Sequence, residues 1–199
     1  MRRVLPVSLL LLSTTLYAEN VKIENGWGVE INPLRLIIST DNDNSWSSFS
    51  GTISHFNNET GVEISLPILY SKDISERDNY KDEKVALDID LHYRQYFSKN
   101  RTTGAYIGAF GRYTYLDGKA MRNSKYATVK KFGVGGEIGF KIKNIFHTPF
   151  YWGASLALGS YIGSDNNIFE TSYMSIDSFD LDDNRYIVDL ELLKVGYEF

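Results

Sequence analysis

Hydrophobic and polar residues alternate with a period of two along most of the chain, most clearly in residues 85–94. The apolar side chains there occupy every second position: Val85, Leu87, Ile89, Leu91 and Tyr93. The ionisable side chains lie between them: Asp88, Asp90, His92 and Arg94. A helix would scatter the apolar positions around its axis, whereas a strand places them on one face. The segment is therefore predicted to be a β-strand with one apolar face and one ionisable face.

The same alternation predicts eight strands in all. They are expected at residues 28–38, 46–56, 62–70, 85–97, 105–115, 132–142, 150–162 and 185–199. No segment combines an apolar i, i+3, i+4 stripe with helix caps, so the predicted fold class is all-β. Pro33 and Pro67 fall inside predicted strands and each removes a ladder hydrogen bond, so bulges are expected at both positions.

The connections between these strands alternate in length. Segments 57–61, 98–104 and 143–149 are short, and 40–45 is of moderate length, whereas 71–84, 116–131 and 163–184 are long and polar. In an up-and-down meander every second connection lies at the same end. Short periplasmic turns opposite long external loops are typical of bacterial outer-membrane barrels. The sequence therefore predicts an eight-stranded antiparallel up-and-down transmembrane β-barrel, with both chain ends at the short-turn end.

Residues 1–18 have the features of a cleaved secretory signal. Arg2 and Arg3 precede an apolar segment at residues 4–12, and Ala18 ends a stretch suited to cleavage. An uncleaved N-terminal anchor is the alternative, but the apolar segment is much shorter than the ~20 residues that span a bilayer as a helix. Residues 19–199 are then expected to form one domain.

The composition narrows the class of function. The chain has no Cys, so stability is expected to come from burial and backbone pairing rather than from disulfides. It has 25 acidic and 21 basic residues, and the signal would remove two of the basic ones. An acidic domain lacks the basic surface on which nucleic-acid binding relies, so no nucleic-acid partner is expected.

Alternation alone does not say which face lies inside. A soluble barrel of the lipocalin type, or a sandwich, would place the apolar face inward, whereas an outer-membrane barrel is inverted. Aromatic residues at the strand ends favour the inverted arrangement, because Tyr and Trp prefer the headgroup zone. They are Trp27, Phe56, Phe97, Tyr106, Phe150, Tyr151 and Trp152 near the short turns, and Tyr70, Tyr113, Tyr115 and Tyr161 near the long loops. Small and charged residues also share one face of residues 132–142, as a narrow lumen requires: Gly133, Gly135, Glu137, Gly139 and Lys141.

The chain ends on Tyr197-Glu198-Phe199, with apolar residues on one face of the last strand: Leu193, Val195, Tyr197 and Phe199. This ending resembles the C-terminal signature of outer-membrane barrels, which the barrel-assembly machinery reads. The match is partial, because Leu192 and Leu193 stand where the pattern often has Gly. In strand number, length and loop layout, residues 19–199 resemble the small OmpX/OmpW/OmpA-type barrels. The resemblance implies a monomer in a Gram-negative outer membrane with periplasmic termini, contacts with lipid and lipopolysaccharide, and periplasmic chaperones and the assembly machinery as partners in biogenesis. It carries no functional residue across.

The inverted arrangement places a set of charged residues in the lumen: Glu63, Asp88, Asp90, His92, Arg94, Arg112, Glu137 and Lys141. They are expected to pair with one another and plug the lumen, because unpaired buried charges are costly and a lumen this narrow is filled by side chains. A proton or ion path and an active site are the alternatives. Lipid A deacylases on small barrels use a His-x-Ser arrangement, which none of the three histidines provides. No catalytic residue, metal site or cofactor is therefore assigned.

Two of the long loops carry opposite charge. The basic one, residues 116–131, holds Lys119, Arg122, Lys125, Lys130 and Lys131, which are suited to lipopolysaccharide phosphates. The acidic one, residues 163–184, holds Asp165, Glu170, Asp177, Asp180, Asp182 and Asp183, which could share divalent cations with those phosphates. The alternative is that charge simply solvates external loops. Residues 41–44 resemble the start of an EF-hand loop but lack its Gly and closing Glu, so a turn is expected.

The function expected from these patterns is a structural or surface-interaction barrel acting through its long external loops. A narrow pore or a hydrophobic-solute carrier of OmpW type is the alternative, and a lipid-modifying enzyme is the third possibility.

Overall fold

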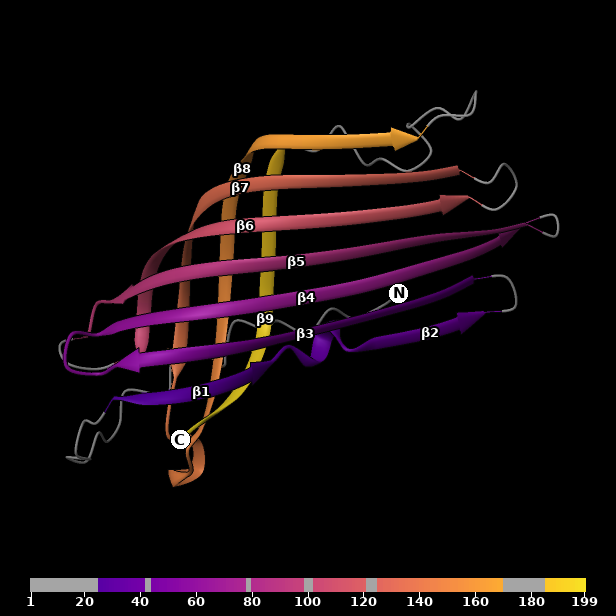
Figure 1. The fold of residues 1–199 in the computed structure, drawn as a ribbon. Helices are drawn as coiled ribbons and strands as arrows, with labels where there is room; N and C mark the ends of the chain where they lie inside the picture. Colours follow the sequence, from indigo (N-terminus) through magenta and orange to yellow (C-terminus); the bar gives the residue numbers. More distant parts are fainter. Residues whose placement is uncertain (1–24, 42–43, 78–79, 99–101, 121–124, 170–184) are drawn as a thin grey trace, which may run out of the picture.

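The computed structural model describes residues 25–41, 44–77, 80–98, 102–120, 125–169 and 185–199, which are almost entirely strand (Figure 1). The strands are β1 (Gly26–Ile31), β2 (Ile37–Asp41), β3 (Asn44–Asn57), β4 (Val62–Arg77), β5 (Tyr80–Tyr96), β6 (Gly104–Ala120), β7 (Lys125–Ile142), β8 (Phe150–Phe169) and β9 (Tyr186–Glu198). Two short 3₁₀ turns complete the described chain, η2 (Pro33–Arg35) and η4 (Ile145–His147). The predicted all-β class is confirmed. Among the described residues, no helix is long and apolar enough to cross a membrane.

The strands form one closed antiparallel barrel. Each strand from β3 to β8 pairs with the next in the sequence, and β1 closes the barrel by pairing with both β9 and β3. β1 and β2 lie against successive halves of β3, so together they occupy one strand position. The barrel therefore has eight strand positions, as predicted.

The prolines behave differently from the predicted bulges. At Pro33 the first predicted strand, residues 28–38, is broken by η2 rather than bulged, and the Asn32 side chain accepts a hydrogen bond from the Leu34 N–H at 3.1 Å. At Pro67 the register between β4 and β5 stays the same on both sides, although the ladder skips the pairs there. Register shifts occur instead at Phe132/Gly133 and at Gly153/Ser155.

The short connections and both described chain ends lie at one end of the barrel, here called the terminus end. Trp27 and Phe199 exchange two backbone hydrogen bonds of 3.0 and 2.8 Å there. The opposite end, here called the hairpin end, differs from the prediction, because residues 71–77, 80–84, 116–120, 125–131 and 163–169 are strand rather than loop. Backbone pairing does not require apolar side chains, so the polar sequence of these arms did not end the strands. In Figure 1 the arms of β4 to β8 reach well beyond β1.

Apolar side chains cover the outside of the barrel and charged side chains lie inside it. On β5, Leu91 and Tyr93 are 59% and 51% exposed, whereas Asp90, His92 and Arg94 are buried. On β7, Phe132, Val134 and Ile138 are exposed, whereas Glu137 and Lys141 are buried. The inverted arrangement predicted from the sequence is the arrangement of the fold.

Four of the aromatic residues expected to face lipid point inward instead. Phe56, Tyr106 and Tyr151 are buried at the terminus end, and Tyr161 packs on the internal apolar cluster. Glycines make room for these rings: a Cβ on Gly196 would stand 2.1 Å from the Tyr151 ring. Position near a strand end suggested a girdle, but alternation along the strand decides the face.

Candidate functional site in the barrel lumen

Arg94 is the centre of a buried charge network. Its side chain is fully buried between two equally buried carboxylates. The guanidinium donates to Glu63 at 2.7 Å through Nη1 and to Glu137 at 2.6 Å through Nε. Glu63 and Arg94 come from the neighbouring strands β4 and β5, and Glu137 comes from β7, two strand positions beyond β5. Arg94 thereby neutralises two buried carboxylates that would otherwise repel each other.

His92 links this centre to a second cluster. Its Nδ1 lies 2.7 Å from the Glu137 Oε1, and its Nε2 lies 3.2 Å from the Asp90 Oδ2. Arg112 holds Asp90 with two parallel hydrogen bonds of 2.8 and 2.7 Å, the geometry that makes guanidinium–carboxylate pairs strong. The chain of contacts thus runs continuously from Arg112 to Arg94.

At the terminus end the network continues through Lys141. Its ammonium group donates to both oxygens of Glu63 at 2.9 and 2.8 Å and lies 3.8 Å from Glu30. The Phe56 and Tyr151 rings lie 4.7 and 4.5 Å from the same nitrogen, so cation–π contacts complete its surroundings. Tyr96 also donates to Glu63.

The short turn at this end adds one more ammonium group, which is partly buried. Lys143 lies 2.7 Å from Glu198 and 3.7 Å from the centre of the Phe56 ring. Burial lowers the pKa of Lys143 to about 8, although the Glu198 carboxylate opposes this change.

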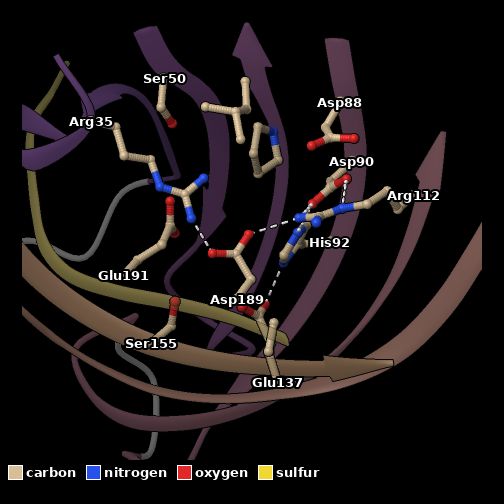
Figure 2. A pocket seen from close by; sticks show the side chains of 13 residues that line it. Arg35, Ser50, Asp88, Asp90, His92, Arg112, Glu137, Ser155, Asp189 and Glu191 are labelled. Carbon is tan, nitrogen blue, oxygen red and sulfur yellow. Dashed lines mark hydrogen bonds and ion pairs between the residues drawn. The ribbon is translucent and has the colours of Figure 1, made fainter. Parts of the chain in front are cut away.

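Asp189 joins the network from β9 and was not assigned by the sequence analysis. It accepts a hydrogen bond from Arg112 at 2.8 Å and another from Arg35 of η2. Figure 2 shows Asp189 between the two guanidinium groups. The alternation of Asp189 and Glu191 against Val188 and Leu190 marked these carboxylates as inward. The inward position of Arg35 could not be predicted in this way, because η2 interrupts the alternation of polar and apolar residues.

The structure brings together seven of the eight predicted lumen residues and leaves one outside the ion-paired chain. Asp88 is directed to the same lumen, but it accepts a hydrogen bond from Thr114 rather than from a charged partner. Glu30, Glu191 and Lys194 are further inward charges that the sequence analysis missed, and the last two form an ion pair. Leu192 and Leu193 mark the register shift in β9 that lets both Glu191 and Lys194 face inward.

The network leaves little free space in the middle of the barrel. The cavity beside Asp90, His92 and Glu137 has a volume of about 20 Å³, which is room for a single water molecule (Figure 2). Both ring nitrogens of His92 face carboxylates, so this ring does not activate a hydroxyl nucleophile. His55 lies outside the lumen, 4.9 Å from the Trp27 ring centre, and His147 lies in η4. The geometry therefore suits a plug.

The five basic residues expected to grip lipopolysaccharide do not form one surface. Lys131 points into the barrel, with its ammonium group 5.4 Å from the Tyr161 ring centre. The expected outward position of Lys131 is wrong, because β7 continues through Lys131 with the alternation of the lumen. Lys119 and Lys130 are half-buried on β6 and β7, whereas Arg122 and the side chain of Lys125 lie outside the described part.

β7 also places this basic segment beside the acidic one, because Lys130 pairs in register with Asp165 of β8. Residues 1–24, with the predicted signal, and residues 170–184, with most of the acidic segment, lie outside the described residues. Residues 42–43, at the centre of the predicted turn at 41–44, are outside them as well, and Asp41 pairs with Asn44. Among the residues described, no group of three or more His, Cys, Asp or Glu side chains is arranged to hold a metal ion.

At the terminus end, Tyr197 and Phe199 face outward on the same side of β9. Comparisons of the chain with protein-family models, with curated proteins and with solved structures give no match. The functional argument therefore rests on the barrel and its lumen.

Proposed function

We propose that this protein is a bacterial outer-membrane β-barrel with a sealed lumen, which acts structurally or as a contact surface through its hairpin arms. The observation that carries the proposal is the inverted distribution of side chains. Every strand position exposes large apolar side chains, while the buried interior holds paired charges. In water such an exterior would favour aggregation, whereas in a bilayer it is the solvated surface.

Strand length supports a role for the arms. β4 to β8 have 16 to 20 residues, whereas about 9–11 residues suffice to cross a bilayer. The surplus lies at the hairpin end and carries charged side chains, such as the cross-strand pair Lys72–Glu83 at 2.6 Å. Polar paired strands standing outside the membrane form a rigid surface, which suits contact with lipopolysaccharide or with another molecule.

Fractionation of bacterial cells tests the location. The full chain is expected in the sarkosyl-insoluble outer membrane, and the folded barrel is expected to migrate differently on a gel before and after boiling. An epitope tag inserted between Ala120 and Lys125 is expected to be detectable on intact cells. A sarkosyl-soluble protein whose migration is indifferent to heating would defeat the proposal.

Planar-bilayer recording tests the sealed lumen. We expect no reproducible single-channel currents from the wild-type protein, because the central cavity has room for about one water molecule. Currents that change when Asp90 or Arg94 is altered would favour the narrow pore.

Contact with lipopolysaccharide is tested by a variant in which Gln replaces the basic residues of the hairpin arm other than the inward Lys131. The replaced residues are Lys119, Arg122, Lys125 and Lys130. Weaker binding of this variant to lipopolysaccharide is expected, and the single variant Lys72→Gln serves as control. Equal binding by both variants would remove lipopolysaccharide phosphates as the partner of this arm.

A further inference from the structure

The ladder that closes the barrel covers only its terminus end. β1 pairs with β9 from Gly28–Glu198 to Ile31–Val195, and there the pairing stops. The chain then turns through η2 and continues as β2, which in the described chain pairs with β3 alone. Between η2 and β9 the wall of the barrel therefore has a seam that no backbone hydrogen bond between described residues closes.

A pocket of about 370 Å³ lies at this seam, and we call it the seam pocket. Its volume is in the range of small-molecule sites. Leu34 and Val188 line its outer side and are 54% and 72% exposed on the apolar surface of the barrel. Trp46 and Leu69 line it from β3 and β4. An apolar path thus leads from the outer surface into the hairpin end of the lumen.

The inner side of the seam pocket is lined by charged groups. Its lining contains two guanidinium groups, Arg35 and Arg112, and one carboxylate, Asp189. Asp189 bridges the two arginines, and Arg112 is further held by Asp90. An Arg side chain has five N–H donors, and Asp189 is the only side-chain acceptor for Arg35 in the described part of the chain. With its side chain 22% exposed, Arg35 can donate to an incoming anion.

Beyond these groups the lumen narrows to the small central cavity. Arg35, Arg112 and Asp189 line both the seam pocket and the small central cavity of about 20 Å³, so they form the wall between them. A ligand that enters through the seam would therefore be held there and would not pass through the barrel.

From this arrangement we propose that the seam pocket binds a single-chain amphiphile with a carboxylate head, of the fatty-acid class, which enters sideways between η2 and β9. The carboxylate accepts hydrogen bonds from Arg35, and the alkyl chain lies along Trp46, Leu34 and Val188 toward the apolar outer surface. Arg112 is already held by Asp90 and Asp189, so it is the remaining N–H donors of Arg35 that favour an anionic head over a cationic one. The proposal depends on the fold and not on the cellular location.

Energy transfer from tryptophan to a dansyl-labelled undecanoic acid tests the proposal in the purified barrel, folded in a non-ionic detergent. We expect saturable transfer that is largely lost in Trp46→Phe, because the two other tryptophans, Trp27 and Trp152, lie near the terminus end. Arg35→Gln should weaken binding of the acid about tenfold or more, as loss of a charged hydrogen bond predicts. It should leave binding of the methyl ester of the probe unchanged, which also shows that the variant is folded.

Val188→Phe should weaken binding of acid and ester alike by narrowing the entrance. Leu158→Phe is the matched control, because Leu158 pairs with Val188 in register, is similarly exposed and does not line the pocket. Absence of saturable transfer, or equal transfer in wild type and Val188→Phe, would overturn the site. Equal affinity for the acid, the ester and a trimethylammonium analogue would overturn recognition of the carboxylate.

Discussion

Replacing Arg94 with Met tests whether the buried network holds the barrel together. Met retains much of the side-chain length but removes the charge that Glu63 and Glu137 share at 2.7 and 2.6 Å. Breaking a buried ion pair by removing one partner costs about 3–5 kcal/mol, because the remaining charge stays buried. Glu63 retains Lys141, and Glu137 retains His92. We therefore expect the free energy of unfolding to fall by the lower part of this range, about 3 kcal/mol.

Lys72→Met supplies the matched control. The Lys72–Glu83 pair has almost the same separation, 2.6 Å, but its side chains are 33% and 28% exposed. Pairs in contact with solvent contribute about 0–1 kcal/mol, so this variant should unfold almost like the wild type. Both variants remove a cation at a similar distance from a carboxylate, and the two sites differ in burial and in the number of carboxylates that the cation holds.

Urea titration of the barrel in lipid vesicles, followed by tryptophan fluorescence, measures both free energies of unfolding. Arg94→Lys should fall between the wild type and Arg94→Met, because Lys keeps the charge but cannot reach both carboxylates with a fixed fork of donors. If Arg94→Met and Lys72→Met differ by less than about 1 kcal/mol, the lumen is hydrated and the reasoning from burial fails.

Three further variants test other features of the barrel. Gly196→Ala should destabilise the barrel markedly, because the new methyl group would meet the Tyr151 ring. Gly111→Ala is the control, because a Cβ at Gly111 would have no neighbouring atom within 4 Å. The control should unfold like the wild type in the same urea titration. Leu91→Arg should lower the free energy of unfolding in vesicles by about 2–4 kcal/mol if Leu91 faces lipid. Leu91→Ala is the control. A change within about 0.5 kcal/mol for Leu91→Arg would indicate that this surface faces water. Because the pKa of Lys143 falls from 10.5 to about 8 on folding, the unfolded chain holds the proton between these values and the folded one does not. The free energy of unfolding of the barrel should therefore gain a contribution from Lys143 that rises from pH 8 to 10. This rise should be absent in Lys143→Met.

Alternation in the sequence was sufficient to predict which side chains lie inside. Gly133, Gly135, Glu137, Gly139 and Lys141 fall on one face of β7 by parity alone, and that face lines the lumen. Whether a residue occupies an odd or an even position does not depend on which strands are neighbours. The face of a side chain can therefore be predicted correctly even where the length of its strand is predicted wrongly. This is why most of the charge network could be predicted although the hairpin arms were assigned to loops.

Features that depend on register between distant strands could not be predicted in the same way. The contact of Arg35 with Asp189 joins residues far apart in the chain and requires both the turn at η2 and the closure by β9. Asp189 and Glu191 face inward together with Lys194 only because β9 shifts register at Leu192 and Leu193, where two adjacent apolar residues interrupt the alternation. Such an interruption can be found in a sequence, but its effect on the facing of later residues depends on the partner strand.

The turn at Pro33 explains why the charge network of the lumen and the seam lie side by side. A proline in a closed barrel removes one ladder hydrogen bond, and the strand can either bulge and stay paired or leave the ladder. Here the Asn32 side chain accepts from Leu34 N–H, which stabilises the turn and directs the chain out of the ladder with β9. The same turn places Arg35 beside Asp189, where a regular strand would have continued the closing ladder. The turn formed at Asn32 and Pro33 therefore has two effects. It completes the charge network through Arg35, and it leaves the adjacent wall of the barrel without a described ladder to β9.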